Sequence, residues 1–123
     1  MDQEFFNLVN SYEPNIKQGI NKCQQDLKNH DTNSLFYSAR DLRDTLSSAI
    51  DQTNSISVSP VYQNMKDVWS SSLGHLNSAA LIFQNYAIST VEQINNATNE
   101  FVLGIETLNN FDNLFRQPHP PIT

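Results

Sequence analysis

Glycine, cysteine and basic residues are all scarce in this chain of 123 residues, which has three glycines, one cysteine, and 7 Lys and Arg against 13 Asp and Glu. Three isolated glycines cannot build the glycine-rich loop that cradles a nucleotide phosphate. A single cysteine, Cys23, excludes an internal disulfide and a multi-cysteine metal site, and it is predicted to be a buried free thiol. The net charge of -6 argues against binding to nucleic acid or to an anionic lipid surface.

The chain also lacks a long hydrophobic run. No apolar stretch approaches the roughly 18–20 residues that a membrane-spanning helix needs, so we expect no direct insertion into a membrane. The first ten residues, MDQEFFNLVN, are acidic and lack the basic start of a signal peptide. We therefore expect a cytoplasmic protein, or an exported one whose targeting segment has been replaced by Met1.

A helical hydrophobic period runs through most of the sequence. In four segments apolar residues recur every three or four positions, which is the spacing of one helix face. The four stripes are Phe5, Val9, Tyr12, Ile16, Ile20, Cys23 and Leu27; Leu35, Ala39, Leu42, Leu46, Ala49, Thr53 and Ile56; Tyr62, Met65, Trp69, Leu73, Leu76, Ala80, Phe83 and Ala87; and Val91, Ile94, Thr98, Phe101, Ile105, Leu108, Phe111 and Phe115. They predict helices over about 3–29, 33–57, 60–87 and 90–115.

Turn and capping residues separate these segments. The stretch NHDTNS, residues 29–34, marks the first break. Ser59 followed by Pro60 is typical of a helix cap with proline at the first helical position. Ser89 with Glu92 three residues later has the form of a capping box and marks the third break. The alternative at that point is one uninterrupted helix formed by the third and fourth segments together.

Pro14 interrupts the first stripe chemically but not in phase. A proline inside a helix removes one hydrogen bond and crowds the preceding turn. Because the apolar spacing continues on both sides of it, we favour one kinked helix; the alternative is a helix that begins near Pro14.

Four helices of similar length with short connections are expected to pack as antiparallel neighbours in chain order. The predicted fold is therefore all-α, an up-down-up-down four-helix bundle. One domain covers residues 1–116, and a proline-rich extended tail covers residues 117–123.

The third and fourth segments carry a resemblance over residues 31–115. Its motifs are a Val-Ser-Pro helix start, a leucine followed by small residues, and a glycine before a short apolar stretch: Val58-Ser59-Pro60, Leu76, Ala79-Ala80 and Gly104. This order resembles small helical-bundle domains of uncharacterised, often exported proteins of methanogenic archaea. The resemblance implies an extracytoplasmic or anchored domain. It supplies no established activity, so no functional residue is carried over from it. Where those domains have a glycine near the third turn, this chain has Tyr86-Ala87.

Catalytic and metal-binding signals are weak. None of the three histidines follows an acidic residue by three positions, as the Glu-x-x-His motif of di-iron bundles requires. Paired carboxylates for acid–base work must project into a pocket. We expect solvated positions instead for Asp51, Asp67, Glu92, Glu100 and Glu106. The sequence predicts no enzyme activity, no metal and no cofactor.

The stretch WSSSLGH, residues 69–75, contains serines, a glycine and a histidine close together. The apolar row of the third segment passes straight through it, so these serines point in successive directions around one helix. No acidic residue of the same helix is placed to orient His75, as a catalytic triad requires. We expect Gly74, like Gly19 and Gly104, to lie where a neighbouring helix comes close.

Aromatic residues give the one positive signal for a binding site. We predict that they line a groove for a protein partner, a ligand or a second copy of the chain. The candidate residues are Phe36, Tyr37, Tyr62, Trp69, His75, Phe83 and Tyr86, and core packing is the alternative for all of them. The predicted function is a non-catalytic interaction module. The second hypothesis is a small acidic cytoplasmic regulator that mimics nucleic acid, which clustering of Asp41, Asp44, Asp51 and Asp67 on one face would favour.

Overall fold

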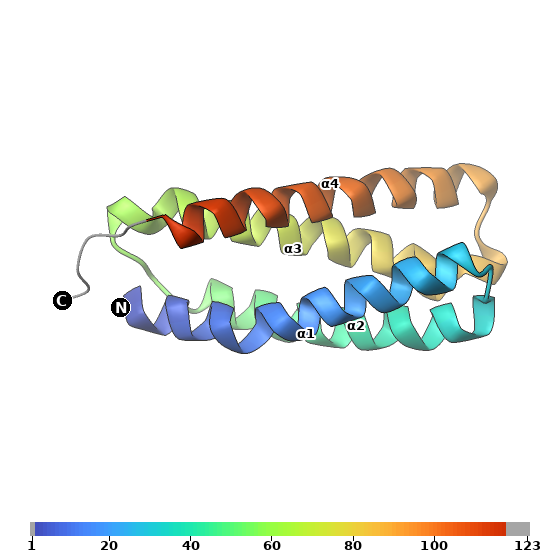
Figure 1. Ribbon diagram of the computed structural model, residues 1–123, viewed down its shortest axis with the longest axis horizontal. Helices are drawn as coiled ribbons and strands as arrows, with labels where there is room; N and C mark the ends of the chain where they lie inside the picture. The colour runs from blue at the N-terminus through green and yellow to red at the C-terminus, as the bar shows by residue number, and fades with distance from the viewer. Residues whose placement is uncertain (1, 118–123) are drawn as a thin grey trace.

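The computed structural model describes residues 2–117, and this part of the chain folds into four long antiparallel helices in two layers (Figure 1). The helices are α1 (Asp2–Lys28), α2 (Thr32–Asn54), α3 (Gln63–Gln84) and α4 (Val91–Arg116), with short 3₁₀ turns η1 (Pro60–Tyr62) and η2 (Tyr86–Ile88). The predicted four-helix bundle is confirmed. Of the expected tail, only Gln117 lies within the described residues.

The two ends of the bundle differ in what they contain. The connections 29–31 and 85–90 lie together at one end, which we call the two-loop end (Figure 1). The start of α1, the connection 55–59 and the end of α4 lie at the opposite end, which we call the terminal end. Every helix therefore runs the full length between the two ends.

Aromatic side chains fill the core at the terminal end. The ring of Phe111 lies 6.4 Å from that of Phe5, 5.0 Å from that of Trp69 and 5.3 Å from that of Phe115, between centroids. Trp69 is completely buried, and its Nε1 donates a hydrogen bond to Thr53 Oγ1 at 3.0 Å. This bond satisfies the indole N–H, which would otherwise be costly to bury.

Capping residues start α2 and α4. Asp31 accepts a hydrogen bond from Ser34 N at the start of α2. Helix α4 begins with a capping box, but the prediction of Ser89 and Glu92 for it is wrong by one residue. Thr90 Oγ1 accepts from Gln93 N, and Gln93 Oε1 accepts from Thr90 N. Ser89 instead ends the η2 turn, where its hydroxyl donates to Asn85 O.

The breaks around α3 are more gradual than predicted. Helix α2 ends at Asn54 rather than near residue 57, and α3 ends at Gln84 rather than near residue 87. Ser59 and Pro60 do start a helical segment, but it is the 3₁₀ turn η1. The hydroxyl of Ser59 does not cap it, because this hydroxyl donates to Asp2 Oδ2 at 2.7 Å. That bond ties the start of α1 to the α2–α3 connection.

Helix α1 spans Asp2–Lys28 and includes Pro14, so the favoured single helix is found rather than a helix that begins near Pro14. Cys23 is a buried free thiol, as predicted. Residues 60–115 do not form one helix, because the chain turns at residues 85–90.

Two of the three helix glycines permit close packing. A Cβ atom at Gly104 would lie 2.8 Å from Leu76 Cγ, and one at Gly19 would lie 2.9 Å from Leu42 Cδ1. The prediction for Gly74 is wrong: it is exposed, and a Cβ atom there would meet nothing within 4 Å. Gly74 lines a shallow groove of about 140 Å³ between α2 and α3.

The buried face of α4 is rotated from the predicted stripe in its first half. Ala97 and Gly104 are buried, whereas Val91 and Thr98 are exposed. The reason is that α4 packs closely against α3 and only loosely against α1, so the residues on its α1 side are left outside the core.

Candidate functional site

The seven residues predicted to line a groove do not form one surface. Three of them, Tyr62, Trp69 and Phe83, are buried in the core. Phe36 and Tyr37 are exposed on α2, while His75 and Tyr86 are half-buried. For Tyr62, Trp69 and Phe83 the alternative, packing in the core, is therefore the correct one.

Phe36 and Tyr37 lie on the first turns of α2 at the two-loop end. Their rings pack edge to face, with centroids 5.1 Å apart, and the Arg40 guanidinium lies 5.0 Å from the Tyr37 ring centroid. Tyr86 borders a small pocket beside the α1–α2 connection. These contacts are local to the first turns of α2 and to the α1–α2 connection.

The stretch 69–75 lies in the middle of α3, as its spacing predicts. Ser72 is buried and donates to the carbonyl of Trp69 at 2.7 Å, which satisfies its hydroxyl within its own helix. His75 Nδ1 lies 2.6 Å from Glu100 Oε2, a residue of α4 that we expected on a solvated face. Sequence spacing along α3 could not reveal this partner, because it comes from a different helix.

The His75–Glu100 pair orients the imidazole. A carboxylate only accepts hydrogen bonds, so the ring nitrogen that faces Glu100 carries the proton. The pair is half-exposed on the outer face of α3 and α4, where an ion pair contributes little to stability.

A different surface stands out between α1 and α4. The backbones of these two helices stay farther apart than those of the other three neighbouring pairs. A groove of about 290 Å³ runs between them, with a mixture of apolar, amide and cationic side chains. Its lining residues are Lys17, Ile20, Asn21, Gln24, Ile105, Leu108 and Asn109.

An apolar row on α4 continues from this groove to the two-loop end. Val91, Ile94, Thr98, Val102 and Ile105 share one side of the helix by their spacing, and Ile105 lines the groove. Val91 is 75% exposed and Val102 48% exposed. Ile88, in the η2 turn just before α4, is 83% exposed. We call this row, the groove and the facing side of α1 the α1–α4 face.

Three charged side chains close the α1–α4 face toward the terminal end. Lys17 Nζ lies 2.8 Å from Asp112 Oδ2 and 3.5 Å from Glu13 Oε1. Asp112 is 8% exposed, and the second oxygen of Glu13 is buried with no hydrogen-bond donor. Burial, and after it the adjacent Asp112 carboxyl, together raise the pKa of the Glu13 carboxyl from 4.5 to about 7, against the opposing effect of Lys17. The hydrogen bond to Asp112 likewise raises the pKa of Lys17.

The sequence held only a partial signal for this cluster. Glu13 and Lys17 are four residues apart, the spacing of an ion pair on one helix. Asp112 directly follows Phe111, a residue of the fourth apolar stripe. Its position beside the core face could therefore be read from the sequence. The contact between the two helices was not visible, because it depends on the register of α1 against α4.

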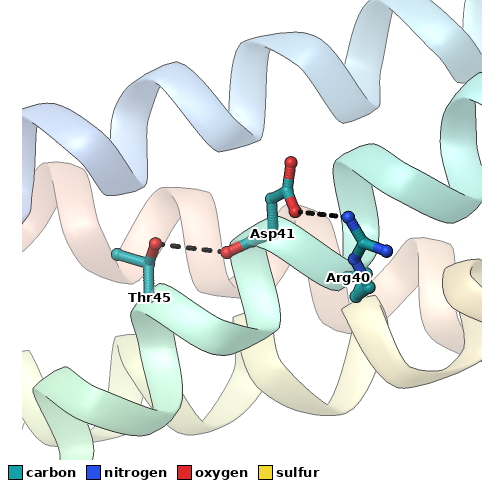
Figure 2. Close-up of polar contacts among 3 residues, drawn as sticks. All are labelled: Arg40, Asp41 and Thr45. Atoms are coloured by element: carbon teal, nitrogen blue, oxygen red, sulfur yellow. Dashed lines mark hydrogen bonds and ion pairs between the residues drawn. The ribbon is translucent and has the colours of Figure 1, made fainter.

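The acidic residues within α2 are exposed to solvent. Asp41, Asp44 and Asp51 lie on one side of this helix by their spacing, and Asp67 is exposed on α3. Arg40 donates to Asp41 Oδ1 at 3.3 Å, and Thr45 donates to the Asp41 carbonyl at 3.1 Å (Figure 2). The Arg40 guanidinium offsets part of the negative charge on this side of α2.

The fold and this face together define a small all-α bundle with an incompletely closed side. No protein family, curated protein or solved structure matches the chain. Within residues 2–117, no helix is long and apolar enough to cross a membrane. The same residues contain no group of three or more His, Cys, Asp or Glu side chains placed to hold a metal ion.

Proposed function

We propose that this protein is a non-catalytic interaction module whose α1–α4 face binds a helix of another protein. The observation that carries the proposal is the apolar row on α4, which lies beside the core face and is not covered by α1. Uncovered apolar side chains in a row along a helix are typical of an interface.

The shape and composition of the α1–α4 face favour a helix as the partner element. A long groove between two antiparallel helices accepts the apolar side of an amphipathic helix, as in other helix-in-groove complexes. Ile105 and Leu108 offer the apolar floor, and the amides of Asn21 and Gln24 offer hydrogen bonds along the rim. A crosslinked product with twice the mass of the chain would identify the partner as a second copy of the chain.

The resemblance to exported archaeal domains extends this proposal to a place outside the cytoplasm. In that setting the partner would be another surface or extracytoplasmic protein. The binding surface itself is argued from the α1–α4 face alone and does not depend on location.

Photo-crosslinking from one residue of α4 tests the proposal. Val102 and Leu103 are adjacent and similarly exposed, at 48% and 44%, but they point to different sides of the helix. A photo-reactive amino acid at position 102, in the cells that make the protein, is expected to give a discrete protein adduct. The same amino acid at position 103 is the matched control and should give none.

A second substitution shows whether the adduct reports binding. Val91→Asp places a charge on the same row three turns away and should reduce the adduct from position 102. Equal adducts from positions 102 and 103, or no adduct from either, would contradict the proposed interface.

A further inference from the structure

The Glu13, Lys17 and Asp112 side chains lie at the only place where the described residues join α1 and α4 by charge, in the middle of α1 and near the end of α4. Lys17 reaches both carboxyl groups from its own helix, one turn after Glu13. With both carboxylates ionised, the cluster carries a net charge of -1 in a largely buried position. With one of them protonated, it is neutral.

The unpartnered oxygen of Glu13 indicates which state fits the closed seam. As a carboxylate oxygen it can only accept, and it is buried with no donor within reach. As a protonated carboxyl it can donate to the adjacent Asp112. A single proton therefore satisfies the buried oxygen and removes the excess charge at once.

We propose that Glu13, Lys17 and Asp112 form a proton-operated latch, which holds α1 against α4 when Glu13 is protonated and loosens this seam when Glu13 ionises. Among residues 2–117, no other charged group on the α1–α4 seam compensates for the second negative charge. The aromatic contact of Phe5 with Phe111 lies at the terminal end, and beyond the cluster a groove lies between α1 and α4.

The surroundings of Glu13 supply no other charged group to this equilibrium. Among the described residues, the charged groups that act on its carboxyl are Asp112 from α4 and Lys17 from α1 itself. Helix α2, the other neighbour of α1, presents the neutral Gln52, which donates to the Tyr12 hydroxyl at 2.7 Å. The pKa of about 7 for Glu13 places the transition near neutral pH.

Cys23 provides a reporter that is already in the chain. It is the only cysteine, it is fully buried on α1, and burial raises its pKa to about 12. A thiol reagent that works in acid, such as a dipyridyl disulfide, can therefore label it only when α1 opens. The labelling rate also rises with pH for reasons of thiol chemistry, so it must be compared with a variant that lacks the latch.

Glu13→Gln is that variant, because a neutral amide can donate to Asp112 at every pH. The ratio of the wild-type to the variant labelling rate cancels the thiol chemistry. We expect this ratio to rise about tenfold as the pH increases through about 7. Glu4→Gln, which neutralises an exposed carboxylate on the same helix, is the control and should behave as wild type.

Two further measurements keep the result specific to the seam. The wild-type rate above neutral pH should depend only weakly on urea, because local opening exposes little surface compared with global unfolding. Lys17→Met removes the cation that favours ionised Glu13 and should shift the transition to higher pH. A ratio that stays constant with pH, or a Lys17→Met transition at the wild-type pH, would overturn the latch. The test uses the chain alone, so it does not depend on the proposed partner.

Discussion

Helix α4 forms two seams of opposite character. Against α3 it packs closely, with Gly104 beneath Leu76 and the rings of Phe83 and Phe101 5.2 Å apart. Against α1 it makes aromatic contacts at the terminal end, then the charged cluster, and then leaves a groove. One side of the helix thus serves permanent packing, and the adjacent side forms a contact that depends on charge.

The difference arises from small features of the sequence. A glycine lets two backbones approach, and close approach excludes water and fixes the register. A buried cluster of three charges does the reverse, because its stability depends on how many of them are ionised. The two seams should therefore respond differently to substitution and to pH.

The largest expected effect is at the terminal end, where the two seams meet. Phe111 contacts Phe5 on α1 and Trp69 on α3, so Phe111→Ala removes packing from both seams. We expect a loss of about 3–5 kcal/mol in the free energy of unfolding, measured by urea denaturation. Leu103→Ala, at an exposed position of the same helix, should change it by less than about 0.5 kcal/mol. Equal effects of the two substitutions would contradict this packing.

Gly104→Ala should break the α3–α4 seam alone. The added Cβ would meet both the side chain and the backbone nitrogen of Leu76, at 2.8 and 3.1 Å. We expect a net loss of about 1–3 kcal/mol, since the helices must move apart. Gly74→Ala meets nothing and should stabilise the protein by up to about 1 kcal/mol, because alanine favours the helix. Thermal or urea unfolding of the pair checks the opposite signs.

The fold could be predicted from the sequence because one signal dominates it. Apolar residues every three or four positions gave four helices, and short connections gave their order. The polar contacts could not be predicted in this way, because they depend on how the helices pack in three dimensions. Asp112 and Glu100 are paired with Lys17 and His75 from other helices, and no spacing along one helix could reveal those partners.

Two local predictions failed for physical reasons that the sequence did not exclude. Gly74 and Gly104 both lie inside long helices, yet only Gly104 faces a neighbouring helix. Which glycine faces a neighbour depends on how each helix is rotated about its axis. The first half of α4 was predicted to bury Val91 and Thr98. Both residues do lie at helical spacing on one side of α4, but α1 lies too far from this side to cover it.

The smallest expected effect concerns the start of α4. Thr90→Ala removes the hydroxyl that accepts from Gln93 N, and we expect a loss of about 1 kcal/mol in the free energy of unfolding. Ser89→Ala should cost less, because Ser89 does not cap the helix. A larger loss of stability for Ser89→Ala than for Thr90→Ala would instead support Ser89 as the capping residue, as expected from the sequence. Urea denaturation of both variants decides between them.

Amide hydrogen exchange in the wild-type chain tests the contrast between the seams most directly. Glu13 has a pKa raised from 4.5 to about 7, so its contribution to stability is complete below 4.5 and is lost as the pH rises through about 7. Because the cluster is partly solvated, we expect a loss of about 1–2 kcal/mol rather than the full shift. Protection factors in α1 should therefore fall about tenfold between pH values just above 4.5 and just above 7, while those in α3 stay constant. Protection that falls equally in α1 and α3, or in neither, would contradict a proton-dependent α1–α4 seam.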